Sequence, residues 1–364
     1  MIRKLPSRLI INSILTSFLF TTLPPVPAGK PGPIDPSAFR LKSIDDACHQ
    51  FSSEEYFERW YMDASFDNGY SFVTSWQMAN MKVKGVPMPF RLIEFAIYDP
   101  KGKKTSVLPI FKVDDYSSSQ KSCDVTMGRN HIKGDHPRYE IKFHDGNIGC
   151  ELSFESLTQG FRRPPEGVKY FSEEPERYFA WAIAQPKAKV TGKLILNGNE
   201  IPVTGIGYHD HNWGNCRMAE LYNWWHWGRY QGPIYTLIYS VGQSSSVTGK
   251  KPQSSLIAFK GHDLIEASDL IYADAGDMTL DKVTGVNYQK KLVLRMESPV
   301  IKGTITHNVT SLVENNPMPE HKPGEGKGYL RFLSDCDISL SIKGEKIETN
   351  TSLIHEYVQV NKSE

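Results

Sequence analysis

The chain has 364 residues, enough for about two domains of typical size. Hydrophobic residues make up 39% and charged residues 23%, a balance that excludes both a disordered tail and a membrane bundle. The 42 basic side chains of Lys and Arg nearly match the 41 acidic ones, so the chain lacks the basic excess that nucleic-acid binding requires.

The first 28 residues have the layout of a secretory signal peptide. Basic residues precede an uncharged apolar run over residues 9–23, and Val26 and Ala28 occupy the −3 and −1 positions of a cleavage site. A transmembrane anchor is the alternative, but the run is shorter than the ~20 residues that a span requires. We therefore expect a secreted, extracellular protein that keeps no membrane span after cleavage.

Two further features agree with the secretory pathway. Asn-x-Ser/Thr sequons begin at Asn308, Asn350 and Asn361, and we expect glycosylation at the first two because Asn361 is nearly terminal. Five cysteines in an oxidising compartment predict one or two disulfides and at least one unpaired thiol. The sequence contains no C-x-x-C pair, so it indicates neither a zinc ribbon nor a redox motif. The cysteines are Cys48, Cys123, Cys150, Cys216 and Cys336.

Apolar and polar residues alternate along most of the chain, which is the period of a β-strand. The clearest hairpin signal is Asn197-Gly198, between alternating segments at 194–196 and 201–203. Short helices are expected only at Ser53–Trp60 and Glu176–Ala184. The other predicted strands are Phe72–Trp76, Ile93–Ile97, Tyr139–Phe143, Cys150–Phe154, Tyr235–Val241, Ser255–Phe259, Leu292–Met296, Tyr329–Leu333, Ile338–Ile342 and Leu353–Val360.

This pattern predicts an all-β fold. Strands at spacings of about 8–12 residues with turns between them favour a sandwich or a barrel. The chain is too long for one small barrel, so we expect two β domains, residues 29–204 and 205–364. Exposed loops are expected at Gln243–Gly249 and Asn315–Gly328.

Residues 205–230 differ from the rest because they hold four of the seven Trp and three of the eleven His. Alternate residues of a strand share a face. In a first strand, one face carries Tyr208, Asp210 and Asn212, and the other carries His209, His211 and Trp213. In a second strand, one face carries Trp225, Trp227 and Arg229, and the other carries Trp224, His226 and Tyr230.

Two such strands side by side would form a wall of indole rings with imidazole, carboxylate and guanidinium groups at fixed places. Aromatic faces stack on flat or polyene ligands, and a cationic side chain donates hydrogen bonds to a ligand oxygen. Two alternatives stay open. Trp clusters and His–Asp pairs also fill β cores. A metal could instead bind His209 and His211, with His226 as a third ligand.

Two motifs in this segment resemble the lipocalin-like superfamily of carotenoid 1,2-hydratases and fungal Diels–Alderases. They are Gly207-Tyr208-His209-Asp210-His211-Asn212-Trp213-Gly214 and Trp225-His226-Trp227-Gly228-Arg229, which together cover under a tenth of the chain. The resemblance implies a sandwich-like domain at 29–204, a lipocalin-like barrel at 205–364, and a ligand between them or in the barrel mouth.

The resemblance offers two chemistries. Hydratases of this kind protonate an isoprenoid double bond with an acidic residue on the strand after the Trp motif. Here that stretch, Leu237–Val241, has no carboxylate. Diels–Alderases need no strong acid. The secretion features and the missing acid make the chain similar to secreted hetero-Diels–Alderases that join a quinone methide to a humulene-type alkene in tropolonic sesquiterpene pathways.

This comparison implies a pericyclase that binds a polyene, quinone methide or terpene and requires no cofactor or metal. Holding both reactants in a near-attack pose can lower the barrier by ~7–11 kcal/mol, and a hydrogen bond to the heterodiene carbonyl lowers it further. An isoprenoid hydratase or cyclase and a non-catalytic carrier are the alternatives. The expected catalytic residues are the hydrogen-bond donors His209, His211, Arg229 and Tyr239, together with Asp210, which would orient a histidine. The expected substrate-binding residues are Tyr208, Trp213, Trp225, Trp227 and Tyr230.

Overall fold

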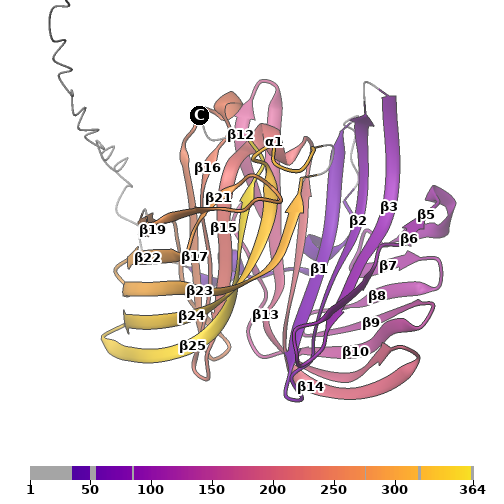
Figure 1. Cartoon of the computed structure of the whole chain (residues 1–364), viewed down its shortest axis with the longest axis horizontal. Helices are drawn as coiled ribbons and strands as arrows, with labels where there is room; N and C mark the ends of the chain where they lie inside the picture. Colours follow the sequence, from indigo (N-terminus) through magenta and orange to yellow (C-terminus); the bar gives the residue numbers. More distant parts are fainter. Residues whose placement is uncertain (1–34, 50–54, 84–85, 275, 319–320, 362–364) are drawn as a thin grey trace, which may run out of the picture. The chain divides into compact units, whose positions relative to one another are not determined.

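The computed structural model describes residues 35–49, 55–83, 86–274, 276–318 and 321–361. The predicted signal peptide and Asn361's sequon partner at 363 lie outside these ranges. Antiparallel strands dominate the described chain, so the all-β prediction is confirmed (Figure 1). None of the helices in the described ranges is long and apolar enough to cross a bilayer.

The first sheet has 14 strands within the described residues and contains every strand from β1 to β14. Its first strand pairs with its last, because β1 lies between β2 and β14 in the order β4-β3-β2-β1-β14-β13-β10-β9-β8-β7-β6. Its strands are β1 Tyr56–Phe66, β2 Ser71–Val83, β3 Val86–Tyr98, β4 Lys104–Val107, β5 Ile110–Phe111, β6 Tyr116–Ser118, β7 Cys123–Met127, β8 Asn130–Asp135, β9 Arg138–Asp145, β10 Ile148–Ser156, β11 Phe161–Arg162, β12 Val168–Glu173, β13 Glu176–Leu196 and β14 Asn199–Gly214.

The second sheet repeats this closure with nine described strands, in the order β18-β17-β16-β15-β25-β24-β23-β22-β19. Here too the first strand, β15, pairs with the last, β25. The strands are β15 Tyr222–Gln231, β16 Tyr235–Ser244, β17 Pro252–Lys260, β18 Asp263–Ser268, β19 Ile271–Asp274, β22 Lys291–Glu297, β23 Ile301–Pro317, β24 Gly328–Ile342 and β25 Glu345–Gln359. A separate pair consists of β20 Met278–Leu280 and β21 Asn287–Gln289.

Helical structure in the described chain is confined to single turns. Both predicted helices are wrong: β1 starts at Tyr56, and Glu176–Ala184 lies in β13. Pairing with β14 on both sides outweighs the local preference of these Glu- and Ala-containing stretches. The turns are η1 Pro36–Phe39, η2 Ser43–Asp46, η3 Val113–Asp115, α1 Met218–Leu221 and η4 Ser246–Thr248.

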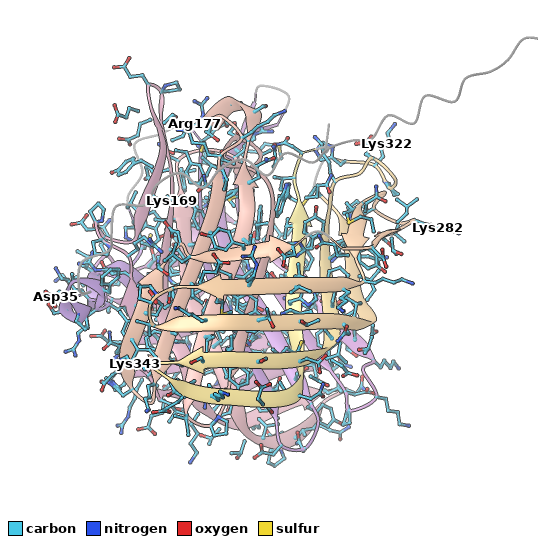
Figure 2. The ribbon with its side chains drawn as sticks, turned by 90° about the vertical axis from the view of Figure 1, so that its left-hand side faces the viewer. Asp35, Lys169, Arg177, Lys282, Lys322 and Lys343 are labelled. Atoms are coloured by element: carbon cyan, nitrogen blue, oxygen red, sulfur yellow. The ribbon has the colours of Figure 1, made fainter. Side chains whose placement is uncertain are left out.

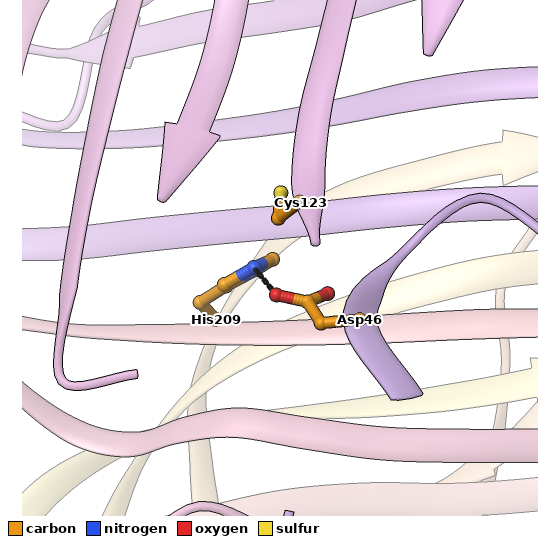
Figure 3. A group of neighbouring side chains, drawn as sticks. All are labelled: Asp46, Cys123 and His209. Carbon is orange, nitrogen blue, oxygen red and sulfur yellow. Dashed lines mark hydrogen bonds and ion pairs between the residues drawn. The ribbon is translucent and has the colours of Figure 1, made fainter. Parts of the chain in front are cut away.

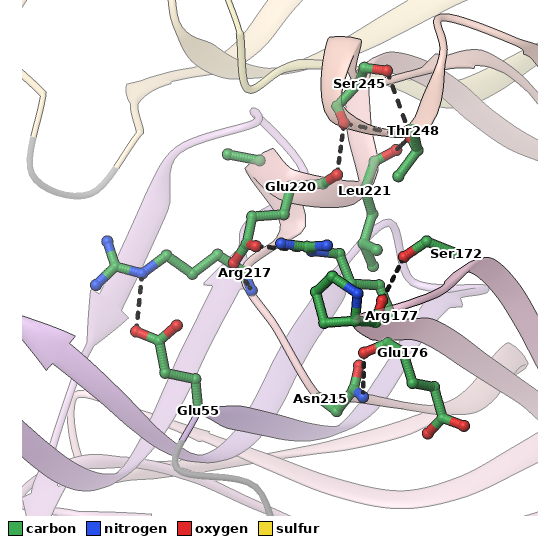
Figure 4. Close-up of polar contacts among 12 residues, drawn as sticks. Glu55, Ser172, Glu176, Arg177, Asn215, Arg217, Glu220, Leu221, Ser245 and Thr248 are labelled. Carbon is green, nitrogen blue, oxygen red and sulfur yellow. Dashed lines mark hydrogen bonds and ion pairs between the residues drawn. The ribbon is translucent and has the colours of Figure 1, made fainter.

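The chain passes from the first sheet to the second between Gly214 and Tyr222, so the predicted boundary at residues 204–205 lies inside β14. Polar contacts fix this connection on both sides (Figure 4). The side chain of Asn215 accepts from the backbone N–H of Tyr178 and donates to the carbonyl of Glu176. Farther along, Glu220 accepts from Arg177 at 2.9 Å.

Three apolar clusters explain how the sheets are arranged. One face of the first sheet encloses a core that includes Trp60, Trp76 and Phe154. The second sheet encloses another core with Leu237 and Tyr239. The third cluster joins the two sheets. Its members are Tyr61, Phe161, Ile183, Tyr208, Ile238, Ile257, Phe259 and Leu264.

Exposed charged residues lie at turns and segment ends, as for Asp35, Lys282, Lys322 and Lys343 (Figure 2). The loop predicted at Gln243–Gly249 contains the end of β16 and η4, and that at Asn315–Gly328 begins inside β23.

The predicted disulfides are absent, because all five cysteines are free thiols in the described structure. They are held separately. Cys48 donates to Glu58 Oε2 at 3.3 Å, Cys336 contacts His307 Nδ1 at 3.0 Å, and Cys123 and Cys150 pack in the first core.

Candidate functional site

The face of the first sheet that is turned toward the second sheet carries a row of polar and aromatic side chains. Tyr61 of β1 is paired with Asp210 of β14, and Asp63 with Tyr208. Directly opposed residues of antiparallel strands point to the same face. Trp181 of β13 joins them by donating from Nε1 to Asp210 Oδ2 at 2.9 Å.

The second sheet supplies the facing side from β15. The Trp227 ring lies 5.5 Å from that of Tyr208 and 6.5 Å from that of Tyr61, measured between centroids. The Arg229 guanidinium lies 4.7 Å from the Tyr208 ring and forms an ion pair with Asp63. The aromatic faces and this ion pair therefore join the two sheets at the site.

Residues on β24 and β25 extend the polar contacts. Arg331 donates to Glu356 at 2.8 Å and to the Tyr61 hydroxyl at 3.2 Å. That hydroxyl donates in turn to Asp63 Oδ2 at 2.8 Å. The Tyr61 phenol is thus held between a guanidinium and a carboxylate, which fixes the ring at the centre of the site.

Asp210 is the carboxyl group whose environment is most unusual at this site. It is 6% exposed and accepts hydrogen bonds from the Tyr208 hydroxyl at 2.8 Å and from Trp181. Its Oδ1 is buried with no hydrogen-bond partner among the described residues. Desolvation raises the pKa of Asp210 above its ordinary value, although the nearby Arg59 charge acts in the opposite direction.

The predicted role of Asp210 as a group that orients a histidine is wrong. Its carboxylate bonds to Tyr208 and Trp181, whereas the rings of His209 and His211 project from the opposite face of β14. The predicted alternation of side chains along β14 is correct. It is this alternation that separates Asp210 from both imidazoles.

His209 and His211 lie in a sealed polar cluster at the edge of the first core, and both are 0% exposed. The Nδ1 atom of His209 donates to the Tyr61 carbonyl at 2.9 Å, and its Nε2 faces Asp46 Oδ2 at 3.1 Å (Figure 3). His211 Nε2 lies 2.9 Å from Glu58 Oε1. The two imidazoles therefore connect β14 to β1 and η2 and do not face the second sheet.

Two groups in this cluster have side chains of the types that bind metals. Asp46, Cys123 and His209 place one such atom each within 4.8 Å of one another, and so do His49, Glu58 and His211. In the described structure, hydrogen bonds between imidazole and carboxylate connect the groups. The alternative set with His226 does not form, because His226 stacks on Tyr357, at 4.5 Å, in the second sheet.

The remaining predicted residues are divided between the two cores and the interface between the sheets. Trp213 belongs to the first core, where it lies 4.9 Å from the His211 ring. Tyr230 and Tyr239 belong to the second core, and the Tyr239 hydroxyl lies 2.8 Å from His307 Nε2. Trp225 contacts Tyr222 at 5.3 Å. Of the expected residues, Tyr208, Asp210, Trp227 and Arg229 come together.

The predicted side-by-side wall is also wrong. β14 pairs with β1 and β13, and β15 pairs with β16 and β25, so the two Trp-rich strands face each other from different sheets. One cavity of about 480 Å³, lined by Arg40 and Gln159 among others, and a groove of about 450 Å³ at Arg295 lie elsewhere. Access to Asp210 therefore requires movement of the partly exposed side chains beside it, Trp181, Trp227 and Arg229.

The sequence-based prediction placed every catalytic and substrate-binding residue between Tyr208 and Tyr239, so it missed the half of the site that β1 supplies. Arg59, Tyr61 and Asp63 alternate along β1 in the same way as Tyr208 and Asp210. That alternation was a usable signal. What the sequence does not show is that β1 and β14, far apart in the chain, are neighbours.

These features define a lipocalin-like all-β protein with a polar and aromatic site between two sheets, and solved structures share the fold. CghA is 13% identical, with a TM-score of 0.64 over 90% of this chain and 97% of that one. Kievitone hydratase from Nectria haematococca is 12% identical, with a TM-score of 0.57 over 91% and 97%.

Sequence relatives point to more particular proteins. The chain is 31% identical over 131 residues to the quinolone epoxide rearrangement protein penF of Penicillium thymicola, covering 34% of each chain. It is 24% identical over 201 residues to the quinolone epoxide rearrangement protein asqO of Emericella nidulans, covering 50% of this chain and 53% of asqO. The chain thus aligns with about a third to a half of these relatives. No family model matches it.

Proposed function

We propose that the protein is an enzyme of secondary metabolism that uses Asp210 as a general acid to cyclise or rearrange an apolar small molecule between the two sheets. The observation that carries this proposal is the buried Asp210 carboxyl, with one oxygen unpartnered and a pKa raised by desolvation. A carboxyl group in such a place keeps its proton to a higher pH than an exposed carboxyl does and can donate it to a substrate.

The neighbours of Asp210 suit the ion that it would leave behind. After Asp210 transfers its proton to a substrate oxygen or alkene, the Tyr208 hydroxyl and the Trp181 N–H stabilise the carboxylate. The rings of Trp227 and Tyr61 lie 6.5 Å apart in an edge-on contact, and movement of Trp227 would present their faces to a flat substrate and to a developing cation. Loss of a proton from the rearranged cation to Asp210 would restore the acid, so the product is an isomer of the substrate.

The relatives support this reaction class. The names of penF and asqO state an epoxide rearrangement, and a hydratase shares the fold. An epoxide opening and an alkene hydration both begin with protonation. The stretch after the Trp motif lacks the acidic residue that the hydratases use. In this proposal Asp210, which lies inside the first motif on β14, takes that role.

A cycloaddition is the second candidate, in the form of the hetero-Diels–Alder reaction of a quinone methide and a sesquiterpene alkene. Arg229 favours it, because Asp63 holds its guanidinium between the Tyr208 and Trp227 rings while 18% of the side chain stays exposed. A donor held in this way could bind a heterodiene carbonyl. Secretion and glycosylation at Asn308 and Asn350 stay predictions. Both amides donate to Asp337, at 3.2 and 2.9 Å.

The test compares the wild type with Asp210→Asn on two probes, a quinolone epoxide and a quinone methide generated in the presence of humulene. Asn keeps the shape and an acceptor but has no acidic proton. We expect the variant to isomerise the epoxide ~10²–10⁴-fold more slowly. Asp124→Asn, at an exposed ion pair with Lys133, is the control and should match the wild type.

Labelled water separates the outcomes. An isomer without the label supports the rearrangement, and incorporation of ¹⁸O would show a hydratase. If the wild type and Asp210→Asn accelerate the quinone methide reaction equally, that result would support the cycloaddition and overturn the acid role. Tight binding of either probe that is recovered unchanged would show a carrier.

A further inference from the structure

Two buried polar atoms on the face of the first sheet that is turned toward the second lack a hydrogen-bond partner among the described residues. One is Asp210 Oδ1, and the other is Arg59 Nε. Arg59 lies on β1 and is paired with Asn212 of β14. This pair is two residues along the strands from the Tyr61–Asp210 pair. Cross-strand pairs share a face, so the two residues that carry these atoms, Arg59 and Asp210, are diagonal neighbours on the same side of the sheet.

The two groups also interact through their charges. The Arg59 charge is the strongest influence that favours the ionised form of Asp210. The guanidinium of Arg59 lies 5.1 Å from the centroid of the Tyr61 ring, and hydrogen bonds to Arg331 and Asp63 fix that ring. Arg59 is therefore a cation held over the fixed Tyr61 ring, and its neighbour Asp210 has one oxygen without a hydrogen-bond partner among the described residues.

Leaving a buried N–H donor and a buried carboxyl oxygen without partners costs ~1–3 kcal/mol each. A bound ligand that accepts a hydrogen bond from Arg59 Nε and another from the protonated Asp210 would remove both costs. An uncharged oxygen, as in a carbonyl or an epoxide, accepts one hydrogen bond from Arg59 Nε and one from the protonated Asp210. An anionic oxygen suits the place less well, because it would lie against a second carboxylate once Asp210 is ionised.

We propose that Arg59 Nε and Asp210 Oδ1 form a subsite for one uncharged oxygen atom of the substrate. This inference rests on the proposed acid role of Asp210 and assigns the substrate class, a flat apolar molecule with a neutral carbonyl or epoxide oxygen. With an epoxide, the O–H bond of Asp210 breaks as its proton moves to the oxygen. The C–O bond breaks with its electron pair on that oxygen, and Arg59 stabilises the carboxylate that remains.

Binding of two probes tests the subsite without any turnover. 4-Phenylquinolin-2-one carries a neutral carbonyl, and 1-phenylnaphthalene is an oxygen-free hydrocarbon of similar shape. We expect the wild type to bind the carbonyl probe about tenfold or more tightly than the hydrocarbon, as for one or two net hydrogen bonds. Arg59→Lys, which keeps the charge but lacks the Nε donor, should lose most of this preference. Arg59→Gln should lose it as well.

Arg91→Gln is the matched control. Arg91 also stacks on a tyrosine, 5.0 Å from the Tyr116 ring, and its Nε is also buried without a partner among the described residues. It lies on β3, away from Asp210. The control should keep the wild-type preference for the carbonyl probe. Equal preference in Arg59→Lys and the wild type, or an equal loss in the control, would overturn the subsite.

The pH profile supplies a readout that a structural role would not change. Activity that needs protonated Asp210 falls as the pH rises through its pKa. Removing the positive charge in Arg59→Gln raises that pKa, so the falling limb of kcat/KM should move to higher pH, whereas Arg59→Lys should keep it in place. The other groups around Asp210 stay unchanged in both variants. Tyr208 and Trp181 donate hydrogen bonds to it, the charge of His209 acts from the opposite face of β14, and Arg229 of the second sheet lies against Tyr208.

The two proposals fail in different ways. Full activity of Asp210→Asn on the epoxide would remove the acid role. An inactive Asp210→Asn combined with Arg59 variants of unchanged probe preference and pH limb would remove only the subsite. Melting temperatures and far-UV circular dichroism establish that each variant is folded, and Arg59→Lys remains informative if Arg59→Gln is not.

Discussion

Replacing Asp46 should destabilise the protein without acting on the chemistry between the sheets. Asp46 is 1% exposed, and its Oδ2 faces His209 Nε2 at 3.1 Å. Because His209 Nδ1 already donates to the Tyr61 carbonyl, Nε2 must carry a second proton to donate to the carboxylate. Asp46→Ala leaves a buried imidazole without its counter-charge, and such losses cost ~3–5 kcal/mol.

Asp46→Asn should cost less. The amide N–H can donate to a neutral His209 Nε2, so one hydrogen bond survives while both charges disappear. A surface control is Asp124→Ala, which breaks an exposed ion pair with Lys133 at 3.4 Å and should cost at most ~1 kcal/mol. Urea denaturation followed by tryptophan fluorescence gives the free energy of unfolding for each variant.

The pH dependence of this loss follows from both partners. Burial alone would raise the pKa of Asp46, but the charge and hydrogen bond of His209 outweigh burial and lower it. Burial alone would lower the pKa of His209, but Asp46 raises it. The stabilisation is therefore complete between the unfolded pKa values of ~3.9 and ~6.5. It declines as the pH falls through the folded pKa of Asp46 or rises through that of His209.

The reasoning is refuted if Asp46→Ala unfolds within 1 kcal/mol of the wild type at pH 5–6. It is also refuted if Asp46→Asn is stable but has lost activity on the epoxide probe in proportion to Asp210→Asn. That result would return His209 to the catalytic role expected from the sequence.

Two further predictions concern the thiols and a glycine. Because all five cysteines are free and burial raises the pKa of Cys48 and Cys216 to about 12, Ellman's reagent should react with five thiols in urea and with almost none in the native protein. A lower count in urea without reductant would show a disulfide. Gly205→Ala should reduce the melting temperature by several degrees, because its Cβ would collide with the Ser65 carbonyl oxygen across the β1–β14 pair. An unchanged melting temperature would contradict that register.

Local patterns in the sequence correctly predicted the features that depend on residues adjacent in the chain, namely a hairpin turn and the alternation of side chains along a strand. The Asn197-Gly198 hairpin is confirmed between β13 and β14, and alternation correctly separated Tyr208 and Asp210 from His209 and His211. Both failures at helices came from judging local propensity alone. In β13, Ala180, Ala182 and Ala184 are fully buried between strands, a context in which alanine's helical preference does not decide the structure.

The rest of the site depends on partners that are distant in sequence. Arg59, Tyr61 and Asp63 reach Asp210 only because β1 pairs with β14. Trp227 contacts Tyr208, and Arg229 pairs with Asp63, from the other sheet. The role assigned to Asp210 failed for the same reason, since its true partners include Trp181 of β13, and no spacing within 205–230 indicates that contact.

The pairing of first with last strands in each sheet has a consequence for biosynthesis. β1 cannot close against β14, nor β15 against β25, until the last strand of each half has left the ribosome. Until then the ladders of β1 and β15 each have an open side in mid-sheet, where a nascent chain could pair wrongly. A chaperone that binds β1 and β15 would cover these unpaired strand sides and prevent wrong pairing until β14 and β25 are available.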